Sequence, residues 1–464
     1  REIRGTSVVL HLKDEQRTYA GGWKLRDLVQ RYSDYISHPI QMPKAPPSGE
    51  EEEASTEIEF ETTNQASALW QRSPEDVTEE QYGEFYKHLT HDWEPPVGRT
   101  HFKIEGAQLF SGFLFVPKRP PFGLFDPDAK HGVRLHVKRV FIMDECDDLL
   151  PRWLRFMRGV IDSDDLPLNV SRELLQDSRI VRVMRKQVVK KSLDLLESIA
   201  ADKPEDFAAL WAHYGTILKE GLHYEPEHKE RLAKLVRFGS SNSEGLVSLA
   251  EYRERMPEDQ PAIYYAIGPS RQQLESSPHL EVLKSRGWEV LYMVDTIDQW
   301  AVQALDSFDE KPLVSATDAE IDLGEAESAE EGDETSGELA ELRAKIAGVL
   351  AESIAEVRVS KRLADSPACL VTPPGGMNVH IEALLRANGQ DVPKSKRIFE
   401  INPSHALITG IEKVREASPE SAKLGEWIEL LYDQAVLAEG MPLEDPARLA
   451  NRMTRLMQSA IDAG

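Results

Sequence analysis

Residues 263–305 read IYYAIGPSRQQLESSPHLEVLKSRGWEVLYMVDTIDQWAVQAL. Two runs in this stretch, 263–267 and 288–294, are typical of buried strands, and helical patterns around 280–284 and 297–305 follow them. Strands separated by short helices predict βαβ units with parallel pairing. This part of the chain is therefore predicted to be a small α/β unit.

The α/β pattern extends upstream of this unit, so residues 64–318 are predicted to form a middle domain. Alternating or continuous apolar runs indicate strands, and 3.6-residue periodicity indicates helices. Strands are predicted at 109–116 and at 133–138, running on into 141–143, and helices at 74–91 and over most of 178–250.

Two segments are predicted to be linkers, because their composition cannot bury a core. Residues 43–63 place a proline cluster before four consecutive glutamates. Residues 319–338 include nine acidic residues and no basic one between Glu320 and Glu338. Each segment is expected to separate two domains.

The regions outside these linkers complete a multi-domain α+β prediction. Residues 1–42 begin with a strand pattern at 6–12 and continue with a helix pattern. A strand needs a neighbour to pair with, so we expect this region to be the remnant of a preceding domain. Residues 339–464 start with an amphipathic helix, carry strand signals at 357–359 and 397–401, and end in two apolar helices.

The overall charge narrows the classes of partner. The chain has 464 residues and a formal net charge of −25, so it repels nucleic acid and anionic lipid. Two cysteines are too few for a disulfide framework, which favours a reducing compartment. No apolar run is long enough to cross a bilayer. We expect a cytoplasmic protein without nucleic-acid or membrane partners.

Residues 162–176, DSDDLPLNVSRELLQ, carry the most chemical information. Asn169 or Ser171 can cap the helix that follows, which places Arg172 on its first turn. The helix dipole favours negative charge at that end, so an arginine there does little for helix stability. Its guanidinium is well suited to binding phosphate oxygens.

Simpler interpretations of these motifs stay open. Arg172 could form a surface ion pair with Asp164 or Asp165. His88 and His91, three residues apart and followed by an aspartate, could mimic metal ligands, but a solvated helix end is the better interpretation, and we expect no metal.

The sequence resembles the 90-kDa heat-shock chaperone family, in its bacterial form, over nearly its whole length. The arginine segment is the strongest match. Others are SALW at 67–70, YGEFYKH at 82–88, RVFIMD at 139–144, SSPHL at 276–280 and WIELLY at 427–432.

The resemblance implies an ATP-driven chaperone that binds unfolded or partly folded clients. In such a protein Arg172 would reach the γ-phosphate of Mg-bound ATP, with Asn169 and Gln176 supporting the loop. The ATP pocket itself would lie before Arg1, so the chain alone is expected to be inactive as an ATPase and to bind no cofactor. Other chaperones stay open as partners. The alternative is a nucleotide-independent dimeric scaffold or holdase.

Two sets of apolar residues are predicted to bind proteins. The client surface is assigned to Met377, Ile381, Leu384 and Leu385, which share one helical face, together with Trp300. The homodimer contact is assigned to the last two helices, through Trp427, Ile428, Leu431, Leu449, Met453 and Leu456. The alternative for both sets is packing in the core of their own domain.

Overall fold

The structure is a computed structural model. It describes residues 4–44, 59–106, 108–126, 128–168, 179–321, 339–377, 379–387, 389–390 and 395–463. The chain divides into two compact units, Arg1–Ile217 and Leu218–Gly464, and the boundary falls within helix α5 (Pro204–Tyr224). None of the helices in the described ranges has the length and apolar character needed to span a membrane.

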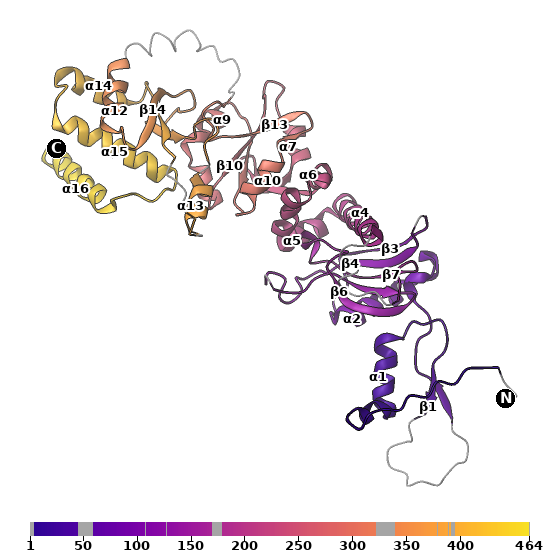
Figure 1. The fold of residues 1–464 in the computed structure, drawn as a ribbon. Helices are drawn as coiled ribbons and strands as arrows, with labels where there is room; N and C mark the ends of the chain where they lie inside the picture. The colour runs from indigo at the N-terminus through magenta and orange to yellow at the C-terminus, as the bar shows by residue number, and fades with distance from the viewer. Residues whose placement is uncertain are drawn as a thin grey trace. The chain divides into compact units, whose positions relative to one another are not determined.

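The first unit is built around a five-stranded sheet with the order β3-β4-β7-β5-β6 (Figure 1). Neighbouring strands are antiparallel, except for the parallel pair β5 and β7. The strands are β3 (Gly98–Ile104), β4 (Phe110–Val116), β5 (Val133–Val137), β6 (Val140–Cys146) and β7 (Arg158–Ser163). Every residue of β4 is buried, as expected for a strand covered on both faces.

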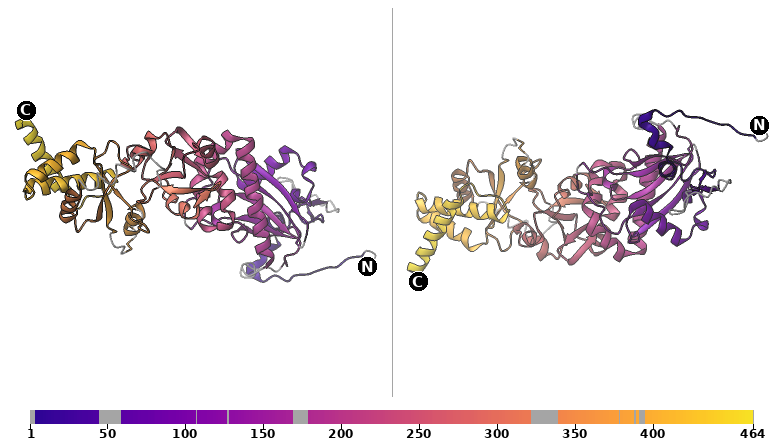
Figure 2. Two further views of the ribbon diagram at one scale, coloured as in Figure 1. Left: turned by 90° about the horizontal axis from the view of Figure 1, so that it is seen from above. Right: turned by 90° about the horizontal axis from the view of Figure 1, so that it is seen from below.

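The sheet of the first unit is covered by helices. Phe85 of α2 packs against Phe113 of β4, with ring centroids 5.3 Å apart. The long helix α4 lies beside the sheet (Figure 2), and Ile199 packs so closely on Gly98 of β3 that a Cβ there would lie 2.6 Å from its Cδ1. The remaining elements are α1 (Gly22–Tyr32), α2 (Glu79–Thr90), α4 (Arg179–Asp202) and the antiparallel ribbon of β1 (Gln41–Pro43) and β2 (Phe60–Thr62).

The second unit contains a six-stranded sheet with the order β12-β13-β10-β11-β8-β9. Strand β10 is parallel to both β11 and β13, which confirms the predicted βαβ pairing. The strands are β8 (Arg237–Ser240), β9 (Ser243–Ser248), β10 (Ile263–Ile267), β11 (Val290–Met293), β12 (Ser307–Phe308) and β13 (Lys311–Ser315). The helices are α6 (Lys229–Leu235), α7 (Leu249–Arg255), α8 (Arg271–Glu275), α9 (Glu281–Ser285) and α10 (Asp298–Ala304).

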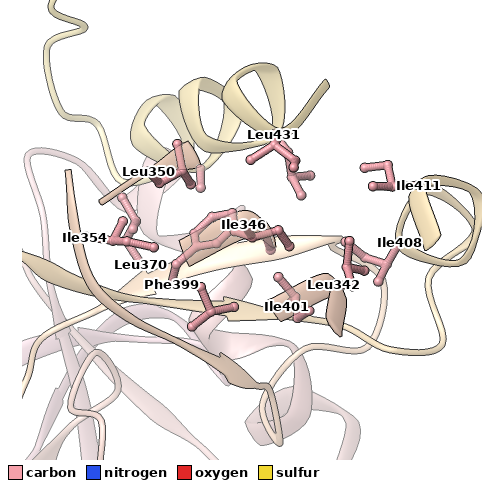
Figure 3. Packing of buried hydrophobic residues seen from close by; sticks show 14 of the residues in the cluster. Leu342, Ile346, Leu350, Ile354, Leu370, Phe399, Ile401, Ile408, Ile411 and Leu431 are labelled. Carbon is pink, nitrogen blue, oxygen red and sulfur yellow. The ribbon is translucent and has the colours of Figure 1, made fainter. Parts of the chain in front are cut away.

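A three-stranded sheet, β14-β16-β15, forms the C-terminal part of the second unit. Figure 3 shows Phe399 from this sheet, Ile346 from α12 and Leu431 from α15 in one apolar core. The strands are β14 (Ile354–Val359), β15 (Ala368–Val371) and β16 (Arg397–Ile401). The helices are α12 (Ala340–Val349), α13 (Val379–Ala387), α14 (Ala406–Ala417), α15 (Ala422–Ala438) and α16 (Pro446–Ala463).

The multi-domain α+β prediction is confirmed, but three local predictions are wrong. Residues 6–12 form no strand in the described structure. Part of the helix predicted over 178–250 is the hairpin of β8 and β9, which turns at Ser241 and Asn242. The strand predicted across 133–143 folds back on itself at Lys138 and Arg139, with φ of 51° and 67°. The predicted linkers at 43–63 and 319–338 lie largely outside the described residues.

Candidate functional site

The arginine segment with Asn169, Arg172 and Gln176 lies outside the described residues. Its flanks are described, because β7 ends at Ser163 before it and α4 begins at Arg179 after it. These flanks determine where the chain enters and leaves the segment.

The end of β7 is held in place by the fully buried carboxylate of Asp162. This carboxylate accepts hydrogen bonds from Trp70 Nε1 at 2.9 Å, Gln71 Nε2 at 3.1 Å and the backbone N–H of Arg139 at 3.0 Å. Three donors offset the cost of burying a charge. Asp162 is not among the residues predicted from the sequence, because nothing distinguishes it there from the neighbouring Asp164 and Asp165.

The turn after β7 is also closed by side-chain hydrogen bonds. Ser163 Oγ accepts from the backbone N–H groups of Asp165 and Leu166, at 3.3 and 3.2 Å. The Asp165 carboxylate accepts from the backbone N–H of Leu109 at 2.6 Å. Burial raises the pKa of Asp164, and the nearby Asp162 carboxylate adds to this shift. The approach to the arginine segment is therefore a defined turn.

Trp300 lies half-buried on α10, two residues after Asp298, which takes part in a buried ion pair. The Asp298 carboxylate is fully buried and lies 2.7 Å from Nζ of Lys219, which also contacts Asp295 at 2.8 Å. Burial raises the pKa of Asp298, and Lys219 opposes this shift. The ion pair holds the first turn of α10, the helix on which the half-buried Trp300 lies.

The other predicted client residues lie on or just before α13. The side chain of Met377 is 37% exposed, and Ile381 and Leu385 are half-buried. The side chain of Leu384 lies outside the described part. Apolar side chains on this short element are therefore partly available to solvent.

The last two helices differ sharply in what covers them. On α15, Ile428 and Leu431 are 0% and 3% exposed in the core of their own domain, with Trp427 packed against it, which favours the alternative of core packing for this helix. Leu449, at the start of α16, is also buried. Beyond it α16 exposes an apolar stripe, which consists of Met453 at 51%, Leu456 at 40%, Met457 at 64% and Ile461 at 75%.

Both views in Figure 2 show the end of α16 projecting away from the rest of its domain. Its first half is anchored by Arg452, which pairs with Glu429 and lies 3.2 Å from the Asp433 carboxylate. A helix that is held at its start by Leu449 and Arg452 and is apolar on its open side is suited to a protein partner. The dimer assignment to the last two helices stays a prediction, and the exposed stripe on α16 is the part of it that is open to a partner.

The structure does not assemble the alternative metal site. His88 and His91 are exposed, and Asp92 accepts a hydrogen bond from the Tyr86 hydroxyl at 3.3 Å. Over the described ranges, three potential ligand atoms within 4.8 Å of one another occur instead at Glu225, Glu227 and His228.

Comparison with known proteins shows that the chain is similar to molecular chaperones. The family model described as "Hsp90 protein" matches residues 45–464. The chain is 55% identical over 460 residues to the chaperone protein HtpG of Myxococcus xanthus, covering 98% of this chain and 70% of that relative. It is 46% identical over 464 residues to the chaperone protein HtpG of Bordetella pertussis, covering 98% of this chain and 72% of the relative. The chain belongs to the Hsp90 family.

Proposed function

We propose that this chain is the client-binding and dimerising part of an ATP-driven chaperone. Family membership supports the chaperone class. The observation that carries the client assignment is the partial exposure of Met377, at 37%, and of Trp300. Methionine adapts to many surfaces and tryptophan is a frequent binding anchor, so the pair suits unfolded segments of varied sequence.

The client assignment is tested by replacing Leu384 and Leu385 together with serine. We expect the variant to keep its melting temperature and to suppress aggregation of an unfolded test protein less well. The matched control is Leu407→Ser with Leu437→Ser, two leucines of the same part of the fold that are 52% and 51% exposed. A sharp fall in melting temperature would instead assign the α13 leucines to the core.

Arg172 is proposed to contact the γ-phosphate of Mg-bound ATP when the chain is joined to an ATP-binding domain, with Asn169 and Gln176 supporting it. An arginine that acts mainly in the reacting state affects turnover more than ATP affinity. Arg172→Ala should therefore slow hydrolysis strongly at unchanged ATP affinity. A change in turnover of only about twofold, worth ~0.4 kcal/mol, contradicts this role.

The chain by itself is proposed to bind no ATP tightly and to hydrolyse none. Calorimetric titration with Mg-bound ATP tests this directly, and stoichiometric binding would overturn it. The rival function is a nucleotide-independent holdase, in which the same apolar surfaces bind clients. The rival is favoured if client protection by the joined protein is identical with and without ATP.

The proposed partners are client proteins and a second copy of the chain through α16. Other chaperones stay open as further partners. The net charge of −25 supports the absence of nucleic-acid and membrane-surface partners and is compatible with a cytoplasmic protein.

A further inference from the structure

Arg397, the first residue of β16, is only 5% exposed although its strand is otherwise almost entirely apolar. Its guanidinium donates to Glu382 Oε1 at 2.8 Å, to the backbone carbonyl of Met377 at 2.6 Å and to Thr372 Oγ1 at 3.2 Å. Two of these three acceptors belong to α13 or to the residues that lead into it. The contacts are therefore directed at one short element.

The attachment of α13 to its domain is unusual for a helix. Of its side chains that the structure describes, Glu382 alone is buried, at 6% exposed. Val379, Ile381 and Leu385 are half-buried, and Arg386 is exposed. A surface helix ordinarily buries its apolar face, whereas the one buried side chain among those described on α13 is a carboxylate. Among the described side chains of this helix, the most deeply buried contact is therefore ionic.

Because the ion pair is buried, each of its two charged groups depends on the other. A buried guanidinium needs acceptors for its N–H groups, and a buried carboxylate needs donors, so loss of either partner leaves an uncompensated charge. Burial lowers the pKa of Arg397, while Glu382 and the more distant Glu439 oppose this shift. Arg386, 3.5 Å from Glu382, is a weaker second partner at the surface.

We propose that Arg397 is a positioning residue for the client helix α13, which it ties to the sheet at two points, Met377 and Glu382. The proposal rests on the client assignment of α13 made above. With the ionic tether in place, Ile381 and Leu385 are only half-buried. The helix then keeps its place on the sheet while its half-exposed residues stay available to a client.

The experiment compares Arg397→Met and Arg397→Lys with the parent chain. Amide hydrogen exchange is measured across 379–387, and affinity is measured for a fluorescently labelled, permanently unfolded test protein. Arg397→Met should speed exchange in α13 by about tenfold or more and leave α12 and α15 unchanged. Client affinity should fall by about fivefold or more, because the helix no longer holds one position.

Arg397→Lys keeps the charge but cannot reach all three acceptors, so both effects should be intermediate. This graded rescue would not follow from a general loss of stability. The control is Arg415→Met, since Arg415 joins α14 to α12 through Glu341 and has no contact with α13 in the described structure. It should leave exchange in α13 unchanged.

Unchanged exchange in α13 for Arg397→Met overturns the tether. If Arg397→Met fails to fold, Glu382→Gln gives the same test, since it removes the charge and keeps the shape. Faster exchange with unchanged client affinity also overturns the proposal, because α13 is then not the client element. Failure of the client assignment itself is detected by a separate variant. If α13 does not bind clients, Leu384→Ser with Leu385→Ser also leaves client affinity unchanged.

Discussion

Two buried polar residues of the first unit show how single side chains determine local structure. Asp162 holds the exit of β7 through three donors, and His136 lies among the rings of Tyr35, Trp70 and Phe141. Both occupy positions where an unpaired or charged group is expensive. The direction in which their substitution changes the free energy of unfolding can therefore be predicted.

Asp162→Ala should destabilise the first unit by about 3–5 kcal/mol, because three donors lose their acceptor in a buried site. Asp162→Asn keeps an acceptor oxygen and should cost less. Urea unfolding followed by tryptophan fluorescence measures both. Asp165→Ala, at an exposed carboxylate with one backbone donor, serves as the control and should cost at most about 1 kcal/mol. Equal losses for Asp162 and Asp165 would contradict the anchoring role.

His136 should make the first unit less stable in mild acid. Burial, together with nearby Arg134, lowers the pKa of His136 from 6.5 to about 3. The unfolded chain therefore takes up a proton below about pH 6.5 that the folded chain refuses, so its contribution to stability is present above that pH. This contribution is lost as the pH falls from about 6.5 toward about 3. The loss of unfolding free energy amounts to about 2 kcal/mol by pH 5.

The measurement is the unfolding free energy at pH 7 and pH 5 for the parent chain and for His136→Phe. The variant replaces the imidazole with a ring that cannot titrate, so its loss of stability between the two pH values should be smaller by about 2 kcal/mol. An identical pH dependence in the two proteins would show that His136 titrates normally in the folded state.

At the scale of elements, α15 and α16 both carry apolar residues at helical spacing, but these residues pack in a core in one helix and form an exposed surface on the other. Helix α15 buries Ile428 and Leu431 against the C-terminal sheet, whereas α16 leaves an apolar stripe open beyond its anchored first half. The same pattern therefore forms a core in one helix and a free surface in the next.

Met457→Asp with Ile461→Asp should weaken the dimer and leave the melting temperature nearly unchanged, since both side chains are exposed, at 64% and 75%. Ile428→Ala should instead cost about 2–5 kcal/mol of stability, because it opens a cavity in the core. Light scattering reports the association state, and thermal unfolding reports stability. An unchanged dimer in the α16 variant would rule out the assignment.

At the largest scale that the structure defines, the second unit joins two sheets through the loop at 360–366. Arg362, 2% exposed, donates to the carbonyls of Ala316 at 2.7 Å and Asp318 at 2.6 Å, and to Glu400 at 3.0 Å. Glu281 of α9 accepts from three successive backbone N–H groups of the same loop, at 2.7 to 3.1 Å. Polar contacts thus link the C-terminal sheet to the sheet that precedes it.

Arg362→Met should therefore uncouple the unfolding of the two sheets. The expected loss is about 3–5 kcal/mol, because Glu400 and two carbonyls lose a buried donor. Calorimetry should resolve a separate, lower transition for the C-terminal part. Arg358→Met is the control, since Arg358 pairs with Glu356 beside the same sheet in a more exposed position. A melting profile unchanged from the parent chain would contradict the coupling.

The sequence by itself determined the elements whose patterns are local. The strands β10 and β16 have the predicted bounds, because a short apolar run between turn residues has few other structures open to it. The arginine segment and the family resemblance likewise depend on contiguous residues. Asn169, Arg172 and Gln176 stay predictions, since they lie outside the described residues.

Only the tertiary structure decided which residues are covered, because burial depends on neighbours that are distant in the chain. Asp162 meets donors from residues 91 and 92 positions away. Ile428 and Met453 both belong to apolar stripes with helical periodicity. Ile428 packs in the core with residues of the C-terminal sheet, whereas Met453 is exposed. Arg397 became a candidate tether only when the fold placed it beside α13, because apolar periodicity carries no information about where a charged side chain finds its partner.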